Sequence, residues 1–365
     1  MKFTTTKDIL LKGIQGVQAA ISTKSTLPIL SNLLVEARDD DLVLTTTDLD
    51  IGIVATIPIK PSITGTVTIP AKKFSDIIKE LPDGAQITIA VKKNNLITIE
   101  CEKNAFKIMG LPKEEFPQIP EFKEKNYITI DQGKLKKMVG MTRFAISHDE
   151  TRYVLNGILF AVTPAHIRLV ATDGRRLAMI GEKMQLPKTL ERKFIVPTKA
   201  VNELDRILGE KGDVKICLSE NQVFFDAGQI RMVSRLVEGE FPNYEQVIPK
   251  EAKDKVVVLK DLFLSAIKRV ALFTNTDSMA VKIELSRGKM VLSKSAPYLG
   301  EARVELEADY NGKDIVVGFN PDYFIDFLKN ADQEKVALEL VDAEKPGAIR
   351  IGDEYVYVVL PMQLS

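Results

Sequence analysis

The strongest constraint on the fold of this chain is that its sequence repeats itself three times, with a period of about a third of its 365 residues. An apolar run that ends at Pro or Asn and leads into an amphipathic helix occurs at residues 67–78, 194–204 and 316–324. Thr47 and Asp48 return about 125 residues later as Thr172 and Asp173. Repeated sequence implies repeated structure, so the chain is expected to build similar units in succession.

A third landmark marks the ends of these units. The tripeptide at residues 115–117, Glu-Phe-Pro, recurs at residues 240–242. Charged, proline-bearing stretches follow both copies, as is typical of linkers. We therefore predict three domains, covering residues 1–120, 121–250 and 251–365.

Each third contains two helical patterns and several strand patterns. Apolar residues spaced by three or four positions predict helices at residues 7–21, 71–81, 131–146, 198–211, 260–273 and 320–332. Alternation of apolar and polar residues predicts strands at 87–91, 96–100, 214–218 and 355–358. The expected fold class is α+β, with two helices on antiparallel sheet in each domain.

Charge is distributed unevenly along a chain whose formal net charge is zero. The neutral sum excludes a uniformly basic protein that coats nucleic acid. The six expected helices are nevertheless more basic than the rest, with Lys72, Lys136, Lys137 and Arg143 lying off their apolar stripes. Such residues fit either ordinary solvated helix faces or a sequence-independent surface for a phosphate backbone.

The number of helices bears on this choice. If helices lined a ring, six of them would make a circle roughly 55 Å around, with a hole of about 7 Å. Twelve would make a circle roughly 110 Å around, with a hole of about 25 Å. The diameter of duplex DNA is roughly twice the ~8.5 Å depth of its major groove, or somewhat more. One copy could not encircle it, whereas a head-to-tail dimer could.

Motifs for catalysis are absent from the sequence. The chain has two histidines, His148 and His166, and no nucleophile elbow, dinucleotide-binding or P-loop pattern. Asp48, Asp50 and Asp173 could suggest a metal site, but they follow strands in repeat-equivalent places, which favours a structural role. We predict no catalytic residues, no metal and no cofactor.

The cysteine and hydropathy patterns point to an intracellular protein. Cys101 and Cys217 lie far apart in strand patterns, which predicts two buried free thiols. No apolar run approaches the ~18 residues of a membrane span, and the first residues lack the apolar segment of a signal peptide. The expected location is the cytoplasm, without contact to a membrane.

Several segments resemble the bacterial DNA polymerase III β subunits, the β sliding clamps. The resemblance rests on the opening Met1-Lys2-Phe3-Thr4 and on segments 27–34, 152–157, 170–178, 318–320 and 358–364, all in order on the threefold repeat. It implies a head-to-tail homodimer of six similar domains. This ring would encircle duplex DNA without sequence preference and make the polymerase processive.

The resemblance also implies a groove between the second and third domains for short peptides. Their sources would be the polymerase III α subunit, the clamp loader, and other polymerases and repair proteins. The matching groove positions are Leu155, Thr172, Gly174, Arg175, Arg176, Leu177, Pro242, Val247, Asn320, Tyr323, Pro346, Val359, Pro361 and Met362. Apolar side chains beside Gly and Pro suit a rigid pocket, and Arg and Asn supply hydrogen bonds.

Two further sets of positions are implied by the resemblance. Those that would contact DNA are Lys24, Lys72, His148, Arg152, Tyr153 and Lys199. Those at the subunit interface are Phe106, Ile108, Leu272 and Phe273, with Lys73 and Lys103 pairing with Glu301 and Glu305. The chain departs from the family pattern at Ala105, Val154 and Gln246.

Two other interpretations of the sequence remain open. The first is a different repeat protein that binds partners through its sheet faces, and the second is a glycoside or phosphate hydrolase. A threefold repeat with no chemistry in any copy suits a scaffold better than a catalyst. Salt-dependent retention on DNA would separate the three.

Overall fold

The computed structural model describes residues 1–22, 27–120, 126–250, 255–276, 278–297 and 299–364. The chain divides into two compact units. Unit 1 consists of Met1–Lys136 and Asn202–Leu236, and unit 2 of Lys137–Val201 and Val237–Ser365. Each unit is described by itself.

The six predicted helices are present, each slightly shorter than its sequence pattern. They are α1 (Lys7–Val17), α2 (Ala71–Glu80), α3 (Gln132–Arg143), α4 (Thr198–Ile207), α5 (Lys260–Ala271) and α6 (Pro321–Asn330). The predicted apolar stripe of α1 is buried, with Leu10, Ile14 and Val17 at most 1% exposed. A 3-10 turn, Gln18–Ala20, follows α1 where the pattern predicted a continuing helix.

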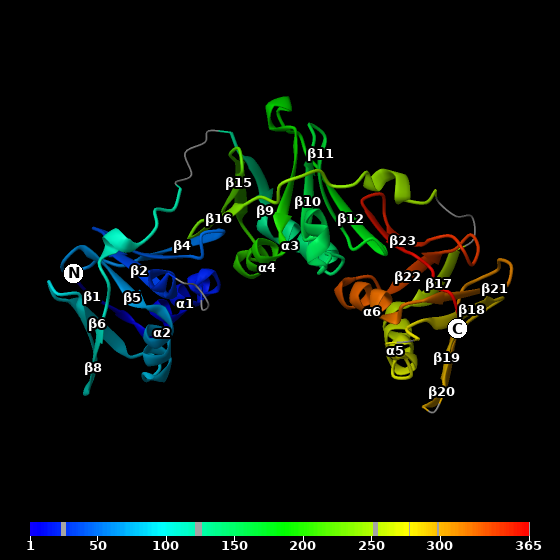
Figure 1. Ribbon diagram of the computed structural model, residues 1–365, viewed down its shortest axis with the longest axis horizontal. Coiled ribbons are helices and arrows are strands. Elements are labelled where there is room, and N and C mark those ends of the chain that lie inside the picture. Colours follow the sequence, from blue (N-terminus) through cyan, green and yellow to red (C-terminus); the bar gives the residue numbers. More distant parts are fainter. Residues whose placement is uncertain (23–26, 121–125, 251–254, 277, 298, 365) are drawn as a thin grey trace. The chain divides into compact units, whose positions relative to one another are not determined.

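Unit 1 contains two antiparallel sheets. The smaller runs in the order β1 (Lys2–Thr6), β6 (Gln86–Val91), β7 (Leu96–Cys101), β8 (Asn104–Met109). The larger has eight strands in the order β5 (Gly65–Pro70), β2 (Asn32–Ala37), β3 (Asp41–Thr47), β4 (Ile51–Pro58), β16 (Ile230–Arg235), β15 (Gln222–Asp226), β14 (Asp213–Leu218), β9 (Ile128–Asp131). Helix α1 packs against β3, β4 and α2 (Figure 1).

Unit 2 has the same two kinds of sheet. Its eight-stranded sheet runs in the order β13 (Arg192–Pro197), β10 (Gly157–Val162), β11 (His166–Thr172), β12 (Arg176–Lys183), β24 (Tyr355–Val359), β23 (Gly347–Ile351), β22 (Lys335–Glu339), β17 (Lys255–Leu259). Its four-stranded sheet runs in the order β20 (Gly300–Glu307), β19 (Lys289–Ala296), β18 (Val281–Ser286), β21 (Ile315–Phe319). Helix α5 packs against α6, β19 and β20.

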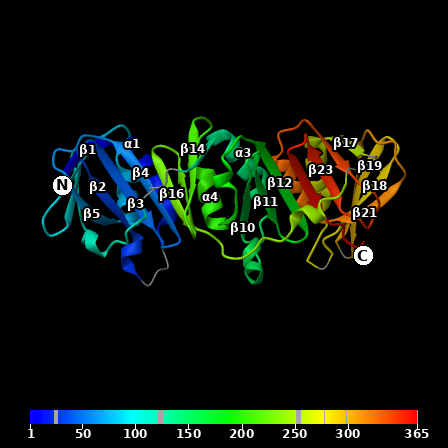
Figure 2. The ribbon, with the colours of Figure 1, turned by 90° about the horizontal axis from the view of Figure 1, so that it is seen from above.

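Each eight-stranded sheet joins strands from two neighbouring repeats. In unit 1, β4 of the first repeat pairs with β16 of the second, from Ile51↔Ser234 to Ala55↔Ile230. Figure 2 shows β3, β4 and β16 side by side although the last is far away in sequence. In unit 2, β12 pairs with β24 in the same way. This pairing satisfies backbone groups that would otherwise line exposed sheet edges.

Other predictions from the sequence can be compared directly. The α+β class and the antiparallel pairing are confirmed. Cys101 and Cys217 are buried and neither forms a disulfide, as predicted. Within the described residues, no helix is long and apolar enough to cross a membrane.

Candidate functional site: the Arg176 cluster and the C-terminal segment

The turn that leads from β11 into β12 places the two arginines of the predicted groove. The Thr172 hydroxyl donates to the Arg176 carbonyl oxygen at 2.6 Å and accepts from Gly174 N at 3.1 Å. The Asp173 carboxylate accepts from the N–H groups of Arg175 and Arg176 at 2.9 and 3.0 Å. Gly174 has φ +86°, a left-handed conformation that favours glycine. The turn is therefore fixed by its own side chains, whose oxygens accept from its N–H groups.

The Arg176 side chain is the centre of a buried network in unit 2. Its Nε lies 3.0 Å from Asp173 Oδ2 and its Nη1 2.8 Å from Asp326 Oδ2 on α6. Its Nη2 donates to the Phe144 carbonyl oxygen at 2.5 Å. The guanidinium also lies over the Tyr323 ring, 4.7 Å from its centroid. These contacts hold the plane of the guanidinium in one orientation.

The electrostatics of this network keep Arg176 charged. Burial alone opposes the charged form, but interactions with Tyr357, Asp326 and Asp173 outweigh it and raise the pKa of Arg176. Burial also raises the pKa of Tyr357, whose hydroxyl donates to the Tyr323 carbonyl oxygen at 2.8 Å. The network thus combines one permanent cation with neutral aromatic rings.

Backbone hydrogen bonds hold the C-terminal segment at two points near this network, one at the turn before β12 and one at β21. Val359 lies opposite Arg176 in the β12–β24 ladder. Beyond the strand, Leu360 N donates to the Arg175 carbonyl oxygen at 2.9 Å, and Met362 N donates to Gly318 O at 2.8 Å. A Cβ at Gly318 would lie 2.5 Å from the Met362 carbonyl oxygen, so the approach needs glycine there. Pro361 and Met362 are consequently fixed in half-buried positions.

The predicted groove residues differ in how much surface they offer. Leu155, Leu177 and Val359 are 7%, 3% and 1% exposed, so they form a packed base. Val247 is 54% exposed at the end of the 3-10 turn Tyr244–Val247, and Pro242 is exposed as well. The base and these exposed apolar residues belong to one unit.

The remaining groove positions have structural roles of their own. Asn320 caps α6 by accepting from Asp322 N at 2.9 Å. Tyr323 is 9% exposed and lies under the Arg176 guanidinium. Pro346 is half-buried and precedes Gly347, which pairs with Val359.

Sequence reasoning missed the residues that hold Arg176, namely Asp326, Phe144 and Tyr357. One signal was present: α6 is acidic while most of the other helices are basic. Its Asp326 binds Arg176, and Asp332, just beyond its end, pairs with Lys137 at 2.9 Å. The acidic character of this region therefore has a structural explanation.

Three predicted DNA contacts lie close together in the segment after α3. His148, Arg152 and Tyr153 are all exposed, Tyr153 by 57%. Asp149 begins the 3-10 helix Glu150–Leu155, and hydrogen bonds from the Thr151 hydroxyl and N–H lower the pKa of its carboxyl. Arg152 lies 3.6 Å from Asp149. Lys72 on α2 and Lys199 on α4 are exposed, and Lys24 lies outside the described residues.

The predicted interface residues lie on two edge strands and at the end of a helix. Phe106 and Ile108 are half-buried on β8, the last strand of its sheet, with Lys103 just before it; Lys73 is exposed on α2. Glu301 and Glu305 are exposed on β20, also an edge strand. Leu272 is 75% exposed after α5, and Phe273 is half-buried against Gly300. Within its own chain Glu305 lies near Lys289 and Arg303, at 3.7 and 3.8 Å.

Comparison with known proteins identifies the family. The sequence matches the N-terminal, central and C-terminal domains of the DNA polymerase III beta subunit over residues 1–120, 129–243 and 245–363. A beta sliding clamp of Pseudomonas aeruginosa is 34% identical over 368 residues, and the match covers 100% of both chains. One of Chlamydia muridarum is 33% identical over 364 residues, covering 100% of this chain and 99% of the relative.

Solved structures agree with the sequence matches. A sliding clamp, DNA polymerase III subunit beta, from Bartonella birtlesii bound to griselimycin has a TM-score of 0.94 and 34% identity over 100% of both chains. A DNA polymerase sliding clamp from Bacillus subtilis has a TM-score of 0.94 and 31% identity, again over 100% of both chains. The chain belongs to the DNA polymerase III beta subunit family, the bacterial beta sliding clamps of DNA replication. The resemblance inferred from the motifs is confirmed.

Proposed function

We propose that two copies of this chain join head to tail into a ring around duplex DNA and hold the replicative polymerase on it. Membership of the sliding clamp family over the whole chain is the observation that carries this proposal. Each copy contributes three domains, at residues 1–120, 121–250 and 251–365. The protein acts as a non-catalytic cytoplasmic subunit without a cofactor, and its processivity effect comes from topology.

The subunit interface forms between the edge strands β8 of one copy and β20 of the other. Both are outermost strands in their sheets, and such edges pair readily with another chain. Phe106 and Ile108 pack against Leu272 and Phe273 of the second copy, and Lys73 and Lys103 face Glu301 and Glu305. The 75% exposure of Leu272 supports this assignment, because so large an apolar surface is costly in water.

Sedimentation of the double variant Leu272→Asp with Phe273→Asp tests the interface. The wild-type chain should sediment near twice 40.6 kDa and the variant as a folded monomer, because burying unpaired carboxylates costs several kcal/mol. Leu262→Asp is the matched control, since Leu262 is 52% exposed on α5 and belongs to no proposed interface. A wild-type monomer at micromolar concentration contradicts the ring.

Contact with DNA in the ring is electrostatic and weak. Lys24, Lys72, His148, Arg152, Tyr153 and Lys199 face the duplex. A neutral chain with few such cations binds free DNA weakly, and this binding falls steeply as salt rises. Retention on DNA therefore depends on the closed ring.

Partner proteins dock by short peptides on the Arg176 cluster and the C-terminal segment. Leu155, Leu177, Val359 and Met362 receive a Leu or Phe anchor, and Pro242 and Val247 form the rim. Thr172, Gly174, Arg175, Asn320, Tyr323, Pro346 and Pro361 complete the site. One or two buried anchors suit the polymerase III α subunit, the clamp loader, and other polymerases and repair proteins. Such a site typically gives micromolar affinity, roughly −8 kcal/mol.

Calorimetry with a polymerase tail peptide tests the docking site. Met362→Ala should cost about 1–3 kcal/mol of peptide binding through lost apolar contact. Deleting residues 361–365 should cost more, because it also removes the hydrogen bond from Met362 N to Gly318. Both variants should remain dimers by sedimentation. If the deletion variant binds the peptide as tightly as the wild type, the docking site is assigned to the wrong residues. If the deletion variant no longer forms the dimer, the subunit interface is assigned to the wrong residues.

A further inference from the structure

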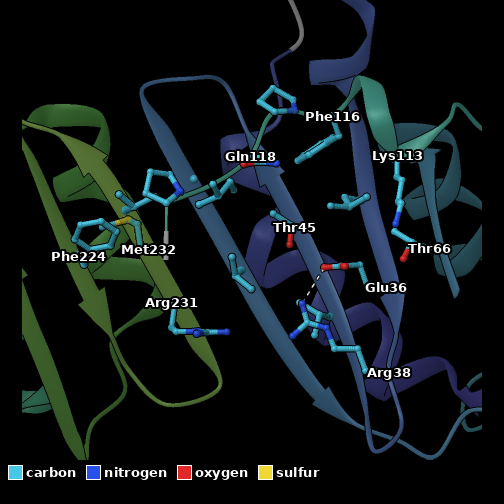
Figure 3. Close-up of a pocket in the computed structure, with 18 of the residues that line it drawn as sticks. Glu36, Arg38, Thr45, Thr66, Lys113, Phe116, Gln118, Phe224, Arg231 and Met232 are labelled. Carbon is cyan, nitrogen blue, oxygen red and sulfur yellow. Dashed lines mark hydrogen bonds and ion pairs between the residues drawn. The ribbon is translucent and has the colours of Figure 1, made fainter. Parts of the chain in front are cut away.

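A cavity of about 1010 Å³ lies in unit 1 between the eight-stranded sheet and the segment that follows β8. Strands β5, β2, β3, β4, β16 and β15 form its floor, and residues 113–120 lie along it. Figure 3 shows Phe116 and Gln118 of this segment on one side and Arg231 pointing from β16 toward Arg38. The walls combine apolar residues such as Phe224 with charged ones.

The corresponding sheet face in unit 2 is more apolar. There the sheet face carries one continuous apolar cluster that includes Leu159, Ala161, Val170, Leu177, Tyr244, Val356 and Val358. In unit 1 the corresponding face carries two separate clusters. Phe116 packs with Ile29 and Leu30 in one, and Ile119 with Phe224 and Val233 in the other. The cavity occupies the space between them.

Repeat-equivalent residues explain why the two faces differ. Strand order and ladder register correspond, since Gly52↔Val233 in β4–β16 matches Leu177↔Val358 in β12–β24. About 125 residues separate the equivalents, so Glu36, Thr45, Gly52 and Arg231 stand where unit 2 has Ala161, Val170, Leu177 and Val356. Polar or smaller side chains thus replace the apolar filling at four adjoining positions.

Arg231 carries a positive charge that no acidic residue of the described cavity wall neutralises. Glu36 and Arg38 neutralise each other at 3.1 Å. The cross-strand neighbour of Arg231, Asp226, uses its Oδ1 to accept from Gly228 N at 2.9 Å. Among the described residues no carboxylate lies within ion-pairing distance of the Arg231 guanidinium. Lys113 and Glu114 on the covering segment balance each other in charge, so the cavity has one positive charge in excess.

The dimensions of the cavity suit an extended chain. Its floor crosses six adjacent strands, which at ~4.8 Å per spacing is roughly 24 Å. An extended peptide of about seven residues covers that length. After the 3-10 helix Lys113–Glu115, residues 116–120 of the protein already lie along this sheet, with Phe116 and Ile119 as their apolar contacts.

We propose that this cavity is a second peptide-binding site, which takes an extended segment of a partner protein carrying an acidic residue next to large apolar ones. The acidic side chain pairs with Arg231, and an apolar neighbour packs against Phe224 and Ile119. The site is separate from the one around Arg176 and stands whether or not that one binds.

Methyl NMR of the full-length protein with labelled Ile, Val and Met tests the proposal. The probe is the peptide acetyl-Gly-Leu-Phe-Asp-Leu-Gly-amide, compared with the same peptide carrying Asn in place of Asp. Ile119, Val54 and Val233 report on the cavity, and Val247 and Met362 on the Arg176 site. The Asp peptide should shift the cavity methyls. The Asn peptide should bind there at least about tenfold more weakly, since its amide oxygen can accept a hydrogen bond from Arg231 but cannot form the ion pair.

Variants of one strand provide the control. Arg231→Gln should weaken the Asp peptide by about tenfold, and Arg231→Val, which copies the residue at the equivalent place in unit 2, by at least as much. Arg235→Gln changes the same charge on β16 outside the cavity and should leave the cavity shifts unchanged. Shifts confined to Val247 and Met362, no shifts at all, or equal affinity for the Asp and Asn peptides would overturn the proposal. Val247 and Met362 report on the Arg176 site separately, so failure of the cavity proposal does not by itself contradict the docking site around Arg176.

Discussion

The turns at residues 47–51 and 172–176 occupy equivalent places in the first two repeats and are built by the same hydrogen bonds. The Thr47 hydroxyl donates to Ile51 O at 2.9 Å, as Thr172 does to Arg176 O at 2.6 Å. Asp48 accepts from two N–H groups, as Asp173 does. The third residue has positive φ in both, 82° at Leu49 and 86° at Gly174. The Thr and Asp side chains therefore determine the backbone conformation of both turns, and the side chains that follow them determine what each turn can bind.

The residue that ends the shared turn differs completely between the two copies. In the first, Ile51 is 1% exposed and belongs to the apolar core. In the second, Arg176 occupies that place and binds Asp173 and Asp326. The sheet faces next to these turns also differ, since unit 2 carries one continuous apolar cluster at the place where unit 1 has the cavity. The two units thus share a backbone arrangement but present different side chains on it.

Truncation at the packed face should have the largest effect on stability. Leu177→Ala should cost about 3 kcal/mol, because it leaves a void in a cluster where Leu177 is 3% exposed. Its counterpart change, Gly52→Ala, adds a Cβ 2.9 Å from Ile119 Cδ1, which can shift, so about 1 kcal/mol is expected. Hydrogen exchange of the β12 and β4 amides measures each locally. Equal losses of stability in the two variants would show that the two sheet faces are packed alike.

Removing a charge from each turn should have a smaller effect. Asp173→Asn keeps an oxygen for the two N–H groups but weakens the pair with Arg176, which should cost about 2 kcal/mol. Asp48→Asn should cost less than about 0.5 kcal/mol, because Ile51 stands in the place of Arg176 and the amide oxygen still accepts. Urea unfolding of both variants measures the difference. A larger loss for Asp48→Asn would mean that the turn, not the ion pair, depends on the charge.

The repeats and the helices could be predicted from the sequence because they depend on local patterns. The stripe of Leu10, Ile14 and Val17 is visible in the spacing alone. The pairing of β4 with β16 was not predicted, since strand patterns do not say which edge meets which. The contact between Arg176 and Asp326 spans 150 residues, and no local signal specifies it.

The cavity in unit 1 was also missed, although the sequence contains its signal. Setting Arg231 beside Val356 and Thr45 beside Val170 shows polar residues at positions that are apolar in the other copy. Recognising this required the ladder register, which fixes which residues share a sheet face. Comparison between repeats thus becomes informative once the strands are paired.

The most direct test of the proposed ring is retention on circular DNA. The protein is loaded by its clamp loader onto a nicked circle, washed at high salt, and the circle is then cut once with a restriction enzyme. A closed ring is held by linkage, so it should stay bound through the salt wash and leave when the DNA becomes linear, while direct contacts are screened by salt. Equal retention on circular and linear DNA would contradict encirclement.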